Sequence, residues 1–204
     1  NLSIPASVTD NGKTYKIVQI GYGAFYGCQD LTSVTIANTV TQIGGFAFTY
    51  DTSIAVLALP DSLKIIGYCA FQSCIALTSI AMPISLECID TAAFYYCIGL
   101  ITIDIPENVK EIRMGAFSRC EKLTSINVSK KNKYYISFDG MLYTYSMDVL
   151  VACPGTKSGT LIVPQTVKII GNMACFYCEK ITSIAFSSSL TRIENDAFCY
   201  CYGL

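Results

Sequence analysis

Apolar and polar positions repeat along this chain with a period of 23 residues. The clearest marker is the dipeptide Ala-Phe, which stands at 24–25, 47–48, 70–71, 93–94, 116–117 and, after one irregular stretch, 197–198. A Leu-x-x-Ile-x-Ile run repeats in step with it, and its first position is held by Leu31, Ile54, Leu77, Leu100, Leu123 and Ile181. A fixed period of this length predicts a solenoid, whose units bury their apolar faces only against one another.

The Leu-x-x-Ile-x-Ile run predicts a short strand with one buried face, because apolar and polar residues alternate in it and β-branched types are common. Proline often follows the run, and since proline has no N–H it cannot prolong a hydrogen-bond ladder. A second apolar pair then precedes Ala-Phe, as Val40 and Ile43 do in one copy. The few remaining positions leave no room for a long helix, so one helical or 3₁₀ turn is expected.

The predicted fold class is therefore a repeat solenoid of the α/β type, mostly β with short helical or 3₁₀ turns. Strands of successive 23-residue repeats are expected to lie about 4.8 Å apart and to form a parallel sheet along one side. One phenylalanine from each repeat is expected to stack in the core.

Residues 1–204 are predicted to form a single domain of this kind. An Asn-Gly turn at 11–12 predicts an N-terminal hairpin within 1–20 that caps the first coil. The last residues stop where the next strand would begin. We therefore expect an open C-terminal end in a chain that naturally continues past Leu204 or has been trimmed there.

One irregular stretch interrupts the period. Val128 and Val163 share a register but lie 35 residues apart instead of 23. The additional residues predict a hairpin insert at about 130–160. Its strands are expected at 141–144 and 149–152 and are expected to protrude from the stack.

Charge and composition exclude several classes of function. The net charge is −1 with no long basic stripe, which argues against a nucleic-acid partner. No apolar run reaches the 18 residues needed for a membrane-spanning helix. Histidine is absent, which excludes Ser-His and Cys-His nucleophiles, and the carboxylates form no obvious facing pair. We therefore expect neither an enzyme nor a cofactor.

The eleven cysteines follow the repeat. Six share one register and are expected to form a buried column of reduced thiols: Cys28, Cys74, Cys97, Cys120, Cys178 and Cys201. The alternatives are a local disulfide or a zinc site made by Cys175, Cys178, Cys199 and Cys201. Against zinc, two of these four belong to the column and Cys175 occupies a phenylalanine position.

Two surfaces are candidates for binding a partner. On the strand side the outward positions are small and almost uncharged, and their polar members are Ser33, Thr35, Ser79, Thr102, Asp104, Ser125 and Asn127. Around the Ala-Phe turns tyrosine recurs, a residue enriched in interfaces; the candidates there are Tyr22, Tyr26, Tyr68, Tyr95 and Tyr96. The plainer alternatives are a solvated sheet without a ligand and tyrosine rings that only cover apolar surface.

The repeat resembles that of the BspA-like class of leucine-rich repeat proteins, which runs as a leucine strand, a proline, an Ile-Gly pair, Ala-Phe and a cysteine. Residues 20–28 and 66–74 match this order closely, and 132–156 resembles the hairpin insert that these proteins often carry. Two departures are Asp51 in place of the repeat cysteine and Cys175 in place of phenylalanine.

This resemblance implies an extracellular or cell-surface protein that acts as a non-catalytic binding scaffold. Its expected partner is a protein or an extracellular-matrix ligand, so the implied role is adhesion. A carbohydrate-binding surface module and an intracellular interaction scaffold are the alternatives. End-to-end self-association at the open C-terminal coil is a further expectation.

Overall fold

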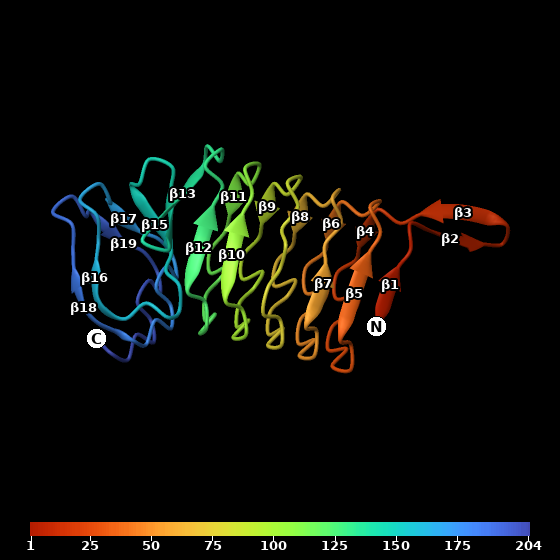
Figure 1. Cartoon of the computed structure of the whole chain (residues 1–204), viewed down its shortest axis with the longest axis horizontal. Coiled ribbons are helices and arrows are strands. Elements are labelled where there is room, and N and C mark those ends of the chain that lie inside the picture. The colour runs from red at the N-terminus through yellow and green to blue at the C-terminus, as the bar shows by residue number, and fades with distance from the viewer.

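The chain forms an elongated stack of coils, each about one sequence repeat long (Figure 1). The computed structural model describes residues 1–204, and every regular element in it is a β-strand. Residues one period apart face each other in neighbouring coils, as Thr102 faces Ser125. The predicted solenoid is thereby confirmed. The structure has no helix that could cross a membrane.

The Leu-x-x-Ile-x-Ile runs lie on one side and form the front sheet, whose strands are parallel. Its members are β1 (Leu2–Ile4), β5 (Ser33–Ile36), β7 (Val56–Ala58), β10 (Thr102–Ile105) and β12 (Ser125–Val128). β1 pairs with β5 and β5 with β7, while β10 pairs with β12. The third coil has no regular strand between β7 and β10, so the sheet has two parts. Alternate side chains enter the core, because Val34 and Ile36 are buried whereas Thr35 is exposed.

A second parallel sheet lies behind the first, and the sequence pattern does not predict it. Its members are β4 (Gln19–Ile20), β6 (Gln42–Ile43), β8 (Ile65–Ile66), β9 (Cys88–Ile89) and β11 (Glu111–Ile112). Each strand has only two residues, and the second is always a buried isoleucine. The apolar pair that precedes Ala-Phe therefore points into the same core as the front sheet.

The Ala-Phe segments are pairs of tight turns closed by hydrogen bonds between residues three positions apart, and they contain no regular helix. In the second coil, Phe46 and Tyr50 have left-handed backbones, with φ of 57° and 63°. Ala47 donates its N–H to the residue three positions back, but Phe48 donates to Ala70 of the next coil at 2.8 Å. Because left-handed residues interrupt a helix, every second N–H is left to join neighbouring coils. The turns thus form a third hydrogen-bonded ladder along the stack.

The predicted column of phenylalanines forms the centre of the core. Neighbouring rings are nearly parallel, and their centroids lie 5.2 to 5.9 Å apart. The column consists of Phe25, Phe48, Phe71, Phe94 and Phe117. The three central rings are fully buried, whereas Phe25 in the first coil is only partly buried. Offset stacking of this kind adds to the stabilisation from buried area.

A column of buried cysteines accompanies the phenylalanines, although Cys28, which the sequence predicts to belong to it, is exposed. The S–H groups of Cys74, Cys97 and Cys120 each donate to the carbonyl oxygen of a phenylalanine in the preceding coil, at 3.1 to 3.2 Å. All three are buried thiols. Asp51 takes the cysteine position in the second coil; it is fully buried, and neither carboxyl oxygen has a hydrogen-bond partner. Burial raises the pKa of Asp51 to about 6, although nearby backbone N–H groups oppose the shift.

The irregular stretch continues the stack instead of protruding from it. Its strands are β13 (Tyr135–Phe138), β14 (Met141–Thr144) and β15 (Val149–Ala152). β15 pairs in parallel with β17 (Ile169–Ile170), which pairs with β19 (Arg192–Ile193). Leu142 and Tyr143 are fully buried. The expected protrusion is wrong because these apolar side chains leave water only when the hairpin lies between coils.

Beyond this stretch the front row of strands resumes. β16 (Gly159–Ile162) pairs in parallel with β18 (Ile181–Ala185). Cys175, at the phenylalanine position, is buried in one cluster with Cys153 and Cys178. Cys199 lies outside this buried cluster.

The N-terminal hairpin forms at the predicted turn but does not cover the first coil. β2 (Ser7–Asp10) and β3 (Lys13–Lys16) are antiparallel, and the turn between them has positive φ at Asn11 and Gly12. Every residue of both strands is exposed, and the hairpin extends along the long axis away from the coils (Figure 1). It leaves the stack between β1 and β4, so its mostly polar strands stay in water. β1, which buries Ile4, covers the edge of β5 instead.

Candidate binding surface

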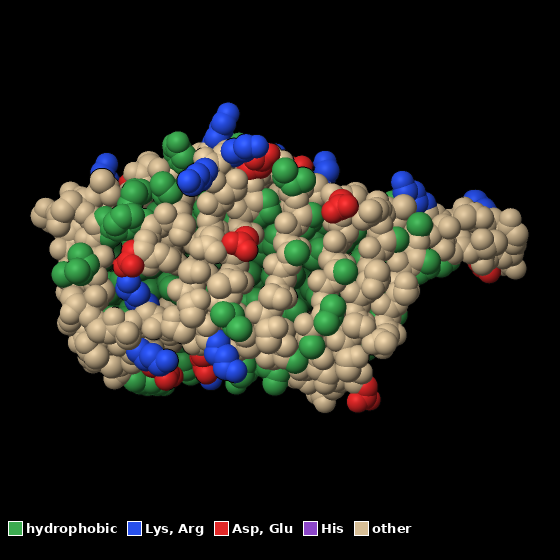
Figure 2. Space-filling view, viewed as in Figure 1, with side chains coloured by type: hydrophobic (Ala, Val, Ile, Leu, Met, Phe, Trp, Pro, Cys, Tyr) green, Lys and Arg blue, Asp and Glu red, His purple; other side chains and the backbone are tan.

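The outward side of the front sheet from β5 to β12 is the first candidate surface, and we call it the strand face. Two rows of side chains point outward on it. One row is Ser33, Val56, Ser79, Thr102 and Ser125, and the other is Thr35, Ala58, Ala81, Asp104 and Asn127. Asp104 is the one charged residue in these rows. Figure 2 shows this side as largely uncharged, with lysines and arginines mostly along its upper and lower edges.

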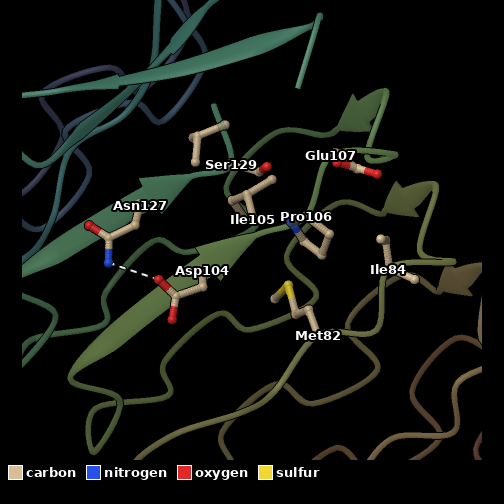
Figure 3. Close-up of a pocket in the computed structure, with 9 residues that line it drawn as sticks. Met82, Ile84, Asp104, Ile105, Pro106, Glu107, Asn127 and Ser129 are labelled. Carbon is tan, nitrogen blue, oxygen red and sulfur yellow. Dashed lines mark hydrogen bonds between the residues drawn. The ribbon is translucent and has the colours of Figure 1, made fainter. Parts of the chain in front are cut away.

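Four of the predicted polar residues come together on β10 and β12. Thr102 lies opposite Ser125, and Asp104 lies opposite Asn127. The side-chain amide of Asn127 donates to Oδ1 of Asp104 at 2.9 Å (Figure 3). This pair is the polar centre of the strand face.

The other predicted polar residues of this face lie apart from that pair. Ser33 and Thr35 belong to β5, and Ser79 belongs to the third coil. The hydroxyl of Ser33 donates to the side-chain oxygen of Asn1 at 2.6 Å, whereas Thr35 and Ser79 are exposed. The structure therefore does not gather these three hydroxyls into one site.

A pocket of about 400 Å³ opens beside Asp104 and Asn127 (Figure 3). Three successive coils line it: the third coil supplies two apolar side chains, β10 and the turn after it supply residues 104–107, and β12 with the next residue supplies 127–129. The pocket lies where the strand face meets the turns that follow the strands. It exists only because the coils are stacked, since its lining spans two repeat periods.

The lining of this pocket joins an apolar surface to two carboxylates. Met82, Ile84 and Pro106 contribute the apolar surface, while Asp104 and Glu107 lie on opposite sides of it (Figure 3). One oxygen of Asp104 accepts the amide of Asn127, and no cation pairs with Asp104. The arrangement suits a group that is apolar along its length and positive at its end.

Glu107 has a weak cationic partner. Nζ of Lys131 lies 3.7 Å from Oε2 of Glu107, and the Lys131 side chain is 82% exposed. An ion pair so open to solvent contributes little and is easily exchanged. The pocket therefore remains negative on an otherwise uncharged face.

Sequence reasoning missed Met82, Ile84 and Glu107. Ile84 carries a signal that could have been found, because the same register holds a polar residue in the other coils: Asn38, Asp61, Glu107 and Lys130. The Ile84 side chain is 62% exposed, so the core does not account for its apolar character. Met82 and Glu107 carry no comparable signal.

Tyrosines of the turn side form the second candidate surface. Tyr22, Phe46 and Tyr68 lie in one column and pack edge to face, with centroids 5.3 and 5.0 Å apart. Tyr26 packs in the same way against Tyr50, at 5.7 Å. Tyr22 is nevertheless 77% exposed. These rings partly cover one another and leave no continuous flat aromatic surface.

Tyr95 and Tyr96 belong to a separate aromatic group. The guanidinium of Arg119 lies between the rings of Tyr96 and Tyr177, at 4.3 and 4.1 Å from their centroids. Tyr95 contacts Phe176, which lies on the far side of the irregular stretch in the sequence. Cation–π contacts of this type hold the two halves of the solenoid together along the turn side.

The chain matches a known family of repeats. A model of the BspA type leucine rich repeat region, with six copies, matches residues 18–141 and 152–204. No protein with a curated description matches the chain.

Solved structures share the fold. A leucine-rich repeat protein from Bacteroides ovatus is 33% identical with a TM-score of 0.69, and the match covers 97% of this chain and 48% of that one. One from Eubacterium ventriosum is 28% identical with a TM-score of 0.79, over 90% of this chain and 49% of that one. A leucine rich cell surface protein from Faecalibacterium prausnitzii is 25% identical with a TM-score of 0.50, over 100% of this chain and 73% of that one. The chain thus spans about half the length of the first two.

Proposed function

This chain belongs to the BspA-type leucine-rich repeat family, and from that premise we propose that it is a non-catalytic scaffold that binds a protein partner. The observation that carries the proposal is the strand face. Its two rows of small, nearly uncharged side chains run over consecutive coils and, outside the third coil, are held by parallel hydrogen-bonded strands. The proposed location is the cell surface or the extracellular medium, and the proposed role is adhesion to a protein or matrix ligand.

Two physical properties make the strand face suitable for a protein partner. Short uncharged side chains can be covered at little cost, because they hold few water molecules strongly and lose little rotamer entropy. Strands locked between neighbouring coils do not need to be ordered when a partner arrives, which lowers the entropic cost of association. The turn side lacks the first property, because it carries large tyrosine side chains.

The proposed location follows from relatives rather than from this chain alone. One similar structure is described as a leucine rich cell surface protein. A signal peptide in the complete gene would support an extracellular location. A complete gene without any export signal would favour the intracellular scaffold instead.

Placing large charges on the strand face tests the scaffold function. We expect Thr35→Arg and Ala58→Arg, two exposed positions of the strand face away from Asp104, each to weaken binding to a matrix protein at least about tenfold, because a guanidinium would be buried without a partner. The measurement is binding of the purified chain to a panel of immobilised matrix proteins, including fibronectin, laminin and collagen. Thr41→Arg, an exposed position just before the second sheet, is the matched control and is expected to change nothing.

Two results would count against this function. One is an equal loss of binding in Thr41→Arg, which would indicate a nonspecific charge effect. The other is a matrix interaction that neither strand-face arginine disturbs.

A carbohydrate ligand is the second candidate, and the exposed ring of Tyr22 is the observation that favours it. Sugars stack on flat aromatic faces, but here the neighbouring rings of the column pack edge to face. A glycan array separates the two functions. Glycan binding that is lost in Tyr22→Ala and kept in Ala58→Arg would support the carbohydrate module.

A further inference from the structure

The pocket beside Asp104 distinguishes one place on the strand face from all others. Elsewhere the outward rows are uncharged, but here a carboxylate stands on the face itself. A partner that covers the strand face must remove Asp104 from water. A buried carboxylate without a full set of donors is costly, so the partner has to bring a donor to this point.

Only one of the two oxygens of the Asp104 carboxylate has a hydrogen-bond partner in the structure. Asn127 donates to Oδ1 of Asp104, which leaves Oδ2 for another donor. Glu107 adds a second negative charge on the other side of the pocket, and its own cation, Lys131, is held only at the surface. The missing donor is therefore best supplied by a cation.

The rest of the pocket suits the stem of a long side chain. Met82, Ile84 and Pro106 form an apolar surface between the two carboxylates (Figure 3). The volume of about 400 Å³ is ample for one extended side chain. Lysine and arginine combine an apolar stem with a charged head, and the fork of arginine matches carboxylate oxygens especially well.

We propose that this pocket is a specificity site that takes a basic side chain, preferably arginine, from an exposed segment of the protein partner. The stem lies along Met82 and Pro106, and the guanidinium donates to the free oxygen of Asp104. Glu107, on the other side of the pocket, adds to the negative potential that attracts the cation. The inference rests on the proposed scaffold function and names the chemistry of the partner at one point.

A pair of small probes tests the pocket without knowledge of the partner. The probes are N-acetyl-arginine amide and N-acetyl-citrulline amide, which have nearly the same shape but differ in charge. They are titrated into the ¹⁵N-labelled chain at low salt, and backbone amide shifts are followed by NMR. We expect the arginine probe to shift amides of residues 82, 104, 105, 107 and 127–129, and citrulline to bind at least about tenfold more weakly, since the charge-assisted bond is lost.

Two matched variants test whether the arginine probe binds at this pocket or at any exposed carboxylate. Asp104→Asn removes the charge with little change in shape, and we expect it to weaken the arginine probe about tenfold. Asp61→Asn removes an exposed carboxylate from the register that Glu107 occupies, two coils away, and is expected to leave the probe affinity unchanged. The fold of both variants is checked by their amide spectra.

Three results would overturn the inference: shifts spread over the surface, equal affinity for arginine and citrulline, or equal weakening in both variants. If a matrix partner binds the strand face but is indifferent to Asp104→Asn, the scaffold function stands and the arginine site fails. If the probe behaves as expected but no protein partner is sensitive to Ala58→Arg, the scaffold function fails while the pocket chemistry stands.

Discussion

The Asp51→Cys variant is expected to be more stable than the natural chain at neutral pH. The buried thiols of this column donate to a carbonyl of the preceding coil, as Cys74 does to Phe48. By register, the equivalent acceptor for Asp51 is the carbonyl of Phe25. An ionised carboxylate cannot donate to it, whereas a thiol or a protonated acid can.

The pH dependence of this effect has a definite sign. The pKa of Asp51 is raised from 3.8 to about 6 in the folded chain, chiefly by burial. The folded state therefore holds the proton more tightly than the unfolded state, and its stability falls as the pH rises from about 4 through 6. At 1.36 kcal/mol per pKa unit, the loss from this group is at most about 3 kcal/mol at pH 7.5.

Urea denaturation at pH 4.5 and pH 7.5 under reducing conditions checks this expectation. In Asp51→Cys the decline between the two pH values should be smaller than in the natural chain, because the one carboxyl that resists ionisation is gone. Asp61→Asn, which alters an exposed carboxyl, serves as the control and should keep the natural decline. The same pH dependence in all three proteins would show that Asp51 finds a partner that stabilises its charge.

Phe94→Ala is expected to destabilise the chain by about 3–5 kcal/mol, the usual range for a buried phenylalanine. Phe94 is fully buried and stacks between Phe71 and Phe117, with centroids at 5.4 and 5.9 Å. Its removal leaves a cavity that neighbouring coils cannot close, because the second sheet and the hydrogen bonds between the turns tie each coil to the next. The loss should therefore lie near the upper part of that range.

Two variants serve as controls for Phe94→Ala, one for loss of the same ring and one for a change on the surface. Phe25→Ala removes the same ring from a partly exposed position and is expected to cost clearly less. Ser125→Ala alters a partly buried hydroxyl on the strand face and should cost little. The measurement is the free energy of unfolding in urea, with the slope checked because coils can unfold in sequence. Equal midpoints for Phe94→Ala and Ser125→Ala would contradict the assignment of inside and outside.

The local features that the period could not predict share a physical cause. Strands as short as Gln42–Ile43 carry no alternation to detect, and they form only because the same pair in the next coil offers hydrogen bonds. The paired tight turns of the Ala-Phe segments depend on left-handed residues such as Phe46, which sequence preference disfavours and the ladder between coils stabilises. Both features are products of stacking.

The irregular stretch shows which features residue counting can predict and which it cannot. Counting residues located the extra chain and its two later strands, because a register can be followed on either side of it. Counting could not show that Tyr143 would be buried or that β15 would pair with β17. Those outcomes depend on which apolar surface the neighbouring coils leave open.

The amino-acid sequence by itself determined the coil stack, the phenylalanine column and the outward rows of the strand face. It could do so because one rule of spacing, repeated every 23 residues, places equivalent side chains in equivalent surroundings. Only the tertiary structure decided what differs between coils: the pocket formed by Met82, Ile84 and Glu107, the contact of Arg119 with Tyr177, and the unpartnered state of Asp51. Such features arise between residues of different coils, where distance and solvent exclusion, rather than the pattern of any one repeat, set the energy.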